Sequence, residues 1–168
     1  MAAGAAGIAT NCGFVKRYQS ERSEALGGPV ASSSLLQAPW AQALLPPGRQ
    51  VGIVTISAAS LTPRHFERAG IPAGSPVAGT DREGAFAGAI LGDALALDVE
   101  AARADVVGAA AGLTARHPAI GALVLECTNM SPYSADVAAA TGLPVYDFVT
   151  FLGWFHSGLR PRRFPLHD

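Results

Sequence analysis

In 122-ALVLECTNM-130, a run of apolar residues suited to a buried strand leads directly into an acid, a thiol, a hydroxyl and an amide. The run shows no apolar/polar alternation, which is typical of a strand buried on both faces of a parallel sheet. A second stretch, 7-GIATNCGF-14, has the same design, and the chain has no third cysteine. Because ligands of open α/β sheets bind outside the carboxyl ends of the strands, both stretches predict a site at a strand end.

Short apolar runs alternate with helix-like runs along the whole chain. Strands are predicted at 51–56, 122–127 and 144–149, with weaker candidates at 7–10, 29–32 and 76–79. Helices are predicted at 14–25, 34–45, 62–69, 98–116, 132–141 and 148–157. This order predicts an α/β fold with mainly parallel sheets.

Local signals set the ends of several predicted helices. Asp98 is expected to cap the helix over 98–116, and Thr62 with Pro63 to begin the helix over 62–69. Gly142 is expected to end the helix over 132–141.

Composition excludes several classes of function. The net charge of −1 gives no electrostatic case for nucleic-acid or membrane binding, and no apolar run approaches the ~20 residues of a membrane span. Two cysteines without an export signal predict reduced thiols and a cytoplasmic protein. The single lysine, Lys16, sits in a polar helix-like stretch, which counts against a pyridoxal phosphate enzyme.

The surroundings of the two cysteines repeat at a spacing of 115 residues, the separation of Cys12 and Cys127. When the sequence is aligned with itself at a shift of 115 residues, Tyr18 aligns with Tyr133. A glycine followed by a Pro-Val strand also recurs after each cysteine. The repeat predicts two similar lobes, each presenting one cysteine at a strand end. We assign residues 1–47 plus 150–168 to a first, incomplete lobe and residues 48–149 to the second, with 46-PPGRQ-50 at the junction.

Two thiols facing each other from two lobes suit the inversion of a stereocentre. That reaction needs a base on one face of the carbon and a proton donor on the other, and a thiolate and a thiol fill both roles without a metal or organic cofactor. The alternative for each cysteine is an ordinary buried residue, since Cys is among the most buried residue types.

The motifs 10-TNCGF-14 and 126-ECTNM-130, their spacing and the segment 51-VGIVTISAASLTP-63 resemble the aspartate/glutamate racemase superfamily. The similarity runs from about Gly7 to Gly158. It implies two pseudo-symmetric Rossmann-like lobes with a small carboxylate substrate in the cleft between them. Family members are commonly dimers, so the resemblance also implies a homodimer.

The resemblance also implies roles for individual residues. Cys12 and Cys127 match the acid/base cysteines of the family. The residues that match its substrate-binding positions are Asn11, Thr128, Asn129, Thr55 and Ser57. For the last two, a polar strand end is the alternative.

Two departures from the family stand out. Many members carry a histidine or an acid where this chain has Asn129, which affects the expected amino-acid specificity. The chain also lacks the segment that family members carry before the first cysteine, so we expect a member truncated at its N-terminus.

From these observations we predict a cofactor-independent racemase or epimerase acting on a small carboxylate, an amino acid such as aspartate or glutamate. A maleate-type cis–trans isomerase, a hydantoin racemase and an inactive truncated remnant stay open as alternatives. Glu126 and Asp147 are expected either to orient a group in the cleft or to serve as helix caps or surface residues. The serine run over 32–34 is expected to be a loop with an N-cap.

Overall fold

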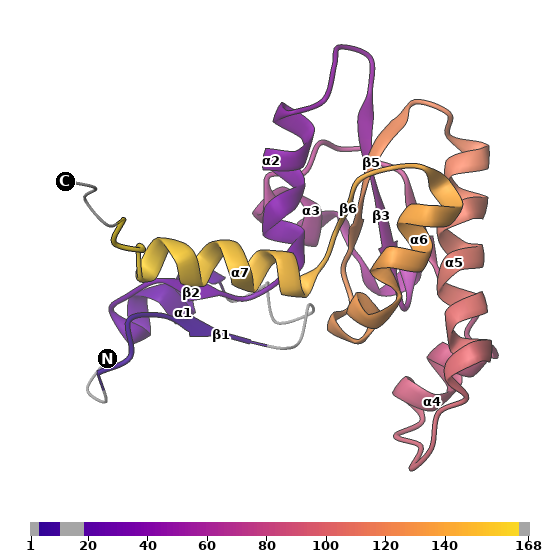
Figure 1. The fold of residues 1–168 in the computed structure, drawn as a ribbon, viewed down its shortest axis with the longest axis horizontal. Helices are drawn as coiled ribbons and strands as arrows, with labels where there is room; N and C mark the ends of the chain where they lie inside the picture. The colour runs from indigo at the N-terminus through magenta and orange to yellow at the C-terminus, as the bar shows by residue number, and fades with distance from the viewer. Residues whose placement is uncertain (1–3, 11–18, 165–168) are drawn as a thin grey trace.

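The computed structural model describes residues 4–10 and 19–164, and this part of the chain folds around two parallel sheets (Figure 1). The larger sheet has the strand order β4-β3-β5-β6, with β3 Gln50–Thr55, β4 Val77–Gly79, β5 Ile120–Leu125 and β6 Val145–Tyr146. The smaller sheet pairs β1 Ile8–Ala9 with β2 Val30–Ala31. All of these strand pairs are parallel, which confirms the predicted α/β fold with parallel sheets.

Helices connect the strands throughout the described chain. They are α1 Gln19–Leu26, α2 Ala38–Ala43, α3 Pro63–Ala69, α4 Ala85–Leu91, α5 Val99–Arg116, α6 Ser134–Thr141 and α7 Phe148–Leu159. The described residues also form the short 3-10 helices η2 Ser34–Gln37, η3 Ala58–Ser60 and η4 Thr128–Tyr133. Within the described ranges no helix is both long enough and apolar enough to cross a membrane. The cytoplasmic location expected from the sequence stays a prediction.

The core lies on both faces of β3 and β5. Ile53 and Val124 are partners in the register of these strands, and both are fully buried. On their face, Leu35 and the apolar side of α2 and α3 complete one cluster. On the opposite face, Phe86 of α4 and Val106 of α5 belong to a second cluster. Burial on both faces explains why the strands carry continuous apolar runs instead of alternation.

Several predicted helix ends are confirmed. The Asp98 carboxylate accepts hydrogen bonds from the backbone N–H groups of Glu100 and Ala101, at 3.1 and 3.0 Å, and so caps α5. Thr62 and Pro63 begin α3. Gly142 ends α6 with a φ of 67°, a left-handed conformation that glycine adopts without strain.

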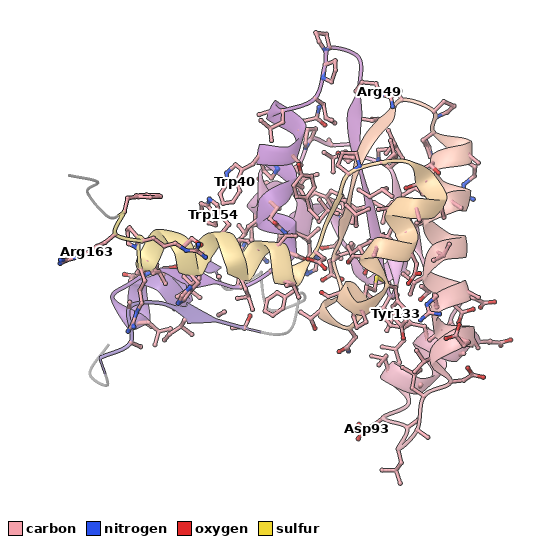
Figure 2. The ribbon with its side chains drawn as sticks, in the orientation of Figure 1. Trp40, Arg49, Asp93, Tyr133, Trp154 and Arg163 are labelled. Atoms are coloured by element: carbon pink, nitrogen blue, oxygen red, sulfur yellow. The ribbon has the colours of Figure 1, made fainter. Side chains whose placement is uncertain are left out.

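Helix α7 lies along the smaller sheet and also contacts α2 (Figure 1). A Cβ atom on Gly7 would collide with Phe155 and Leu159, so α7 packs directly against the backbone that leads into β1. At the other side of α7, Trp154 packs against Trp40 of α2, with ring centroids 4.0 Å apart (Figure 2). Helix α7 therefore joins the smaller sheet to the helical layer of the larger sheet.

The segment before the predicted lobe junction has contacts with the larger sheet. Leu35, Ala38 and Ala41, from η2 and α2, share a buried cluster with Val51 and Ile53 of β3. These contacts place the end of the range 1–47 against the larger sheet. The limits of the two lobes, 1–47 plus 150–168 and 48–149, stay a prediction.

Candidate functional site

The candidate site lies at the carboxyl edge of the larger sheet, where β3 and β5 end side by side. The backbone N–H of Glu126 donates to the carbonyl of Val54 at 2.8 Å, so the two strands are still paired at this point. Thr55 closes β3, and Cys127 comes two residues after β5. Because parallel strands end at the same edge, the topology brings predicted residues from both segments together.

Cys127 lies between β5 and η4, directly before the first residue of η4. It is partly buried and packs against the cluster that contains Ile56 and Met130. Its carbonyl accepts the N–H of Met130 at 3.0 Å, which starts the 3-10 turn. The thiol is thus followed by a 3-10 turn, and the α-helix predicted to follow this motif begins only at Ser134.

The other predicted substrate-binding residues differ in exposure. Thr128 is half-buried and Asn129 is exposed, both in η4. Ser57 is half-buried before η3 and accepts a hydrogen bond from the Ser60 hydroxyl at 2.9 Å. Thr55 is fully buried. Their roles in substrate binding stay predictions.

Two predicted residues, Asn11 and Cys12, lie outside the described residues. The last described residue before them is Thr10, at the end of β1. The Thr10 hydroxyl donates to the backbone carbonyl of Ser32 at 2.9 Å, which joins the end of β1 to the segment that follows β2.

Glu126 is the residue whose placement the sequence did not reveal. It is only 1% exposed, so the expectation of a helix cap or surface position is wrong. The Thr55 hydroxyl donates to Glu126 Oε2 at 2.8 Å, whereas Oε1 is buried and has no hydrogen-bond partner among the described residues. Burial raises the pKa of this carboxyl, because the charged form loses its hydration, and the Thr55 hydrogen bond acts in the opposite direction.

The serine run connects the ends of the two sheets. Ser33 caps η2 by accepting the N–H of Leu35 at 3.2 Å, which confirms the predicted N-cap. Ser34 is fully buried, and its hydroxyl donates to the carbonyls of Leu125 and Glu126, at 2.8 and 3.0 Å. Together with the Thr10–Ser32 bond, these contacts tie the strand that leads toward Cys12 to the strand that leads to Cys127.

Asp147 has a structural role in the described chain. Its carboxylate accepts the N–H of Thr150 at 2.8 Å and the hydroxyl of Ser134 at 2.7 Å. The predicted cap is therefore confirmed: Asp147 begins α7 and holds it against the start of α6.

Similar sequences are dimethylsulfoniopropionate lyases. The chain is 34% identical over 169 residues to such a lyase from Durusdinium sp. clade D, a match that covers 96% of this chain and 55% of that protein. It is 31% identical over 157 residues to dimethylsulfoniopropionate lyase 3 from Emiliania huxleyi (strain CCMP1516), covering 88% of this chain and 40% of that protein. The chain thus spans about half the length of these relatives, or less. No family model matches it.

Solved structures with the same fold are racemases and decarboxylases. Allantoin racemase from Pseudomonas fluorescens superposes with a TM-score of 0.53 at 19% identity, over 82% of this chain and 62% of that one. Arylmalonate decarboxylase gives a TM-score of 0.58 at 15% identity, over 94% of this chain and 70% of that one. These likenesses show the fold alone: the chain shares the fold of allantoin racemase and arylmalonate decarboxylase.

The comparisons correct the functional prediction. An enzyme is supported, but the sequence relatives are lyases, so the prediction of an amino-acid racemase is wrong and the isomerase class is not confirmed. The motifs that resembled the superfamily identified the fold, and they did not identify the reaction.

Proposed function

We propose that this chain carries the reaction site of a lyase that splits dimethylsulfoniopropionate into dimethyl sulfide and acrylate. The observation that supports the proposal is the 34% identity to a dimethylsulfoniopropionate lyase across 96% of the chain. The substrate is a small carboxylate, the class of partner expected from the sequence. A homodimer stays a prediction.

The reaction is a β-elimination. The substrate bears a carboxylate on its α-carbon and a dimethylsulfonium group on its β-carbon. A base removes one α-proton, and the electrons of that C–H bond form the double bond between the α- and β-carbons. The C–S bond breaks and its electron pair leaves with sulfur as neutral dimethyl sulfide. The products are acrylate, dimethyl sulfide and the protonated base.

Cys127 is our candidate for the base. It sits at the carboxyl edge of the sheet and is partly exposed, whereas its neighbour Glu126 is fully buried and held by Thr55. Racemisation requires a base and an acid on opposite faces of a carbon. Elimination requires only one base, because dimethyl sulfide leaves as a neutral molecule. A strand-end thiol therefore suits the lyase as well as the racemase first predicted.

The test is product release by the purified protein. We expect incubation with dimethylsulfoniopropionate to yield dimethyl sulfide, measured by headspace gas chromatography, and an equal amount of acrylate, measured by NMR. Positioned proton transfer typically contributes about 10²–10⁴-fold, so Cys127→Ala is expected to lower kcat by that factor.

Thr114→Ala is the matched control. It removes one polar group from α5 at the end of the helix remote from the site, where the Thr114 hydroxyl donates to the carbonyl of Ala111. A folded protein that releases no dimethyl sulfide would refute the lyase. Unchanged release by Cys127→Ala would refute the assignment of the base while leaving the lyase intact.

A further inference from the structure

A second feature of the same sheet edge is a pocket of about 490 Å³ at the ends of β3 and β4. Its polar lining consists of Ser57 and Ser60, from the turn after β3, and Thr80 and Arg82, from the turn after β4. The β-carbon of an alanine at Gly79 would lie 2.7 Å from the backbone nitrogen of Ala58, so the two turns approach closely. The pocket is therefore built from two strand ends.

Two polar groups of the pocket, those of Arg82 and Ser57, are donors suited to a carboxylate, whereas the Thr80 hydroxyl donates to the carbonyl of Ile56 at 3.3 Å. Arg82 is exposed and forms no ion pair or hydrogen bond with any described residue, so its planar set of N–H groups is available to a ligand. The Ser57 oxygen accepts from Ser60, which leaves its own hydroxyl proton to donate. Of the flanking acids, Asp81 accepts the N–H of Glu83 at 3.0 Å and so stabilises the turn.

The pocket and Cys127 adjoin the same buried cluster. Ile56 lines the pocket and belongs to the buried cluster against which Cys127 packs. Strands β3 and β5 are neighbours, and adjacent strands lie about 4.8 Å apart. In the substrate the carboxylate is bonded directly to the α-carbon, so its anchor must lie close to the base. Ser57 follows β3, one strand from Cys127, whereas Arg82 follows β4, two strands or about 10 Å away, and its long side chain lines the same pocket as Ser57.

We propose that Arg82 and Ser57 bind the carboxylate of the substrate in this pocket, an assignment that rests on the proposed lyase function. The Arg82 guanidinium would then lie beside the group on which negative charge builds up during proton removal. The electrons released at the α-carbon are shared with the adjacent carboxylate of the substrate. Donors placed at such a position stabilise the transition state more than the ground state. Arg82 is then a specificity-determining residue that selects acids over neutral analogues.

The first experiment measures carboxylate binding without catalysis. Propionate is titrated into the protein and followed by NMR chemical shifts. A hydrogen bond to a charged group contributes enough for Arg82→Gln to weaken the affinity about 10- to 100-fold, with partial recovery in Arg82→Lys. Arg116→Gln is the control, because Arg116 is an exposed arginine at the end of α5, at the opposite edge of the sheet.

The second experiment uses the substrate and its primary amide. Wild-type protein is expected to prefer the acid in kcat/KM, and Arg82→Gln is expected to lose most of that preference. If the wild type binds propionate but releases no dimethyl sulfide, the lyase fails while the carboxylate site stands. If Arg82→Gln binds propionate as tightly as the wild type, the site is refuted. The same follows if Thr128→Ala or Asn129→Ala abolishes propionate binding and Arg82→Gln does not weaken it.

Discussion

The two sheets of this protein are held in different ways. Strands β3 and β5 have six residues each and are buried on both faces, between α2 and α3 on one side and α4, α5 and α6 on the other. Strands β1 and β2 have two residues each, and β1 is only partly buried. The larger sheet is stabilised by its core. The smaller sheet depends on α7 and on hydrogen bonds, because a two-stranded sheet is marginal by itself.

Because of this difference, the global stability of the protein and the geometry of the candidate site depend on different parts of the molecule. Cys127 is placed by the core of the larger sheet, but Thr10 is placed by its bond to Ser32. Ser34 then joins that segment to the end of β5. We therefore expect substitutions in the larger sheet to change global unfolding, and substitutions in the smaller sheet to act mainly on local order.

The largest effect is expected from Leu123→Ala in β5. Leu123 is fully buried in the cluster shared with α5 and α6, and truncation of such a leucine leaves a cavity. The expected loss in the free energy of unfolding is about 3–5 kcal/mol, measured by urea denaturation. A loss below about 1 kcal/mol would show that the larger sheet is not the main source of stability.

The next effect is the pH dependence caused by Glu126. Its pKa in the folded protein is raised above 4.5, so the folded state holds the proton more tightly than the unfolded state. The contribution of Glu126 to stability is therefore fully present below pH 4.5 and is lost as the pH rises through the folded pKa. Each unit by which the pKa is raised corresponds to about 1.4 kcal/mol.

Glu126→Gln removes this pH dependence. Relative to the wild type, the variant is expected to gain stability between pH 4.5 and the folded pKa and to reach a plateau above it, measured by urea denaturation across that range. The exposed Glu67→Gln is the control. A stability difference between wild type and Glu126→Gln that does not change with pH would contradict the buried, proton-holding carboxyl.

A smaller effect is expected where the two sheets are joined, at Trp40 and Trp154. Both rings are about half exposed, at 43% and 55%, and they contact each other, while Trp154 also stacks on Phe151 (Figure 2). A double-mutant cycle with alanine at both positions should give a coupling free energy of about 0.5–1.5 kcal/mol. Additive losses would show that α7 is held without this pair.

Local signals predicted much of the fold. Continuous apolar runs indicated β3 and β5, and single residues such as Asp98 and Gly142 set helix ends because their effect reaches only a few residues. The burial of Glu126 was not predictable in this way. Its partner Thr55 is 71 residues away, and Ser34 reaches its carbonyl across 92 residues, so only the folded sheet brings them together.

The proposed reaction was harder to predict than the edge of the sheet where we propose that it takes place. A thiol at a strand end is able to remove a proton next to a carboxylate, and that step is common to racemisation and elimination. What separates them is the leaving group on the neighbouring carbon, and no motif around Cys127 encodes it. Only relatives with a named activity distinguished the two reactions.

The smallest global effect is expected from Ile8→Ala in β1. Ile8 is only partly buried, so the loss of apolar contact should cost about 0.5–1 kcal/mol of unfolding free energy. The local effect should be larger, because Ile8 and Thr10 donate their N–H groups to Pro29 and Ala31. Hydrogen exchange should accelerate more at these two amides than at Ile53, in β3, where the global loss permits only about a 2- to 5-fold increase. Equal acceleration at Ile53 would mean that the two sheets unfold as one cooperative unit, and the separation between core stability and local order would then be wrong.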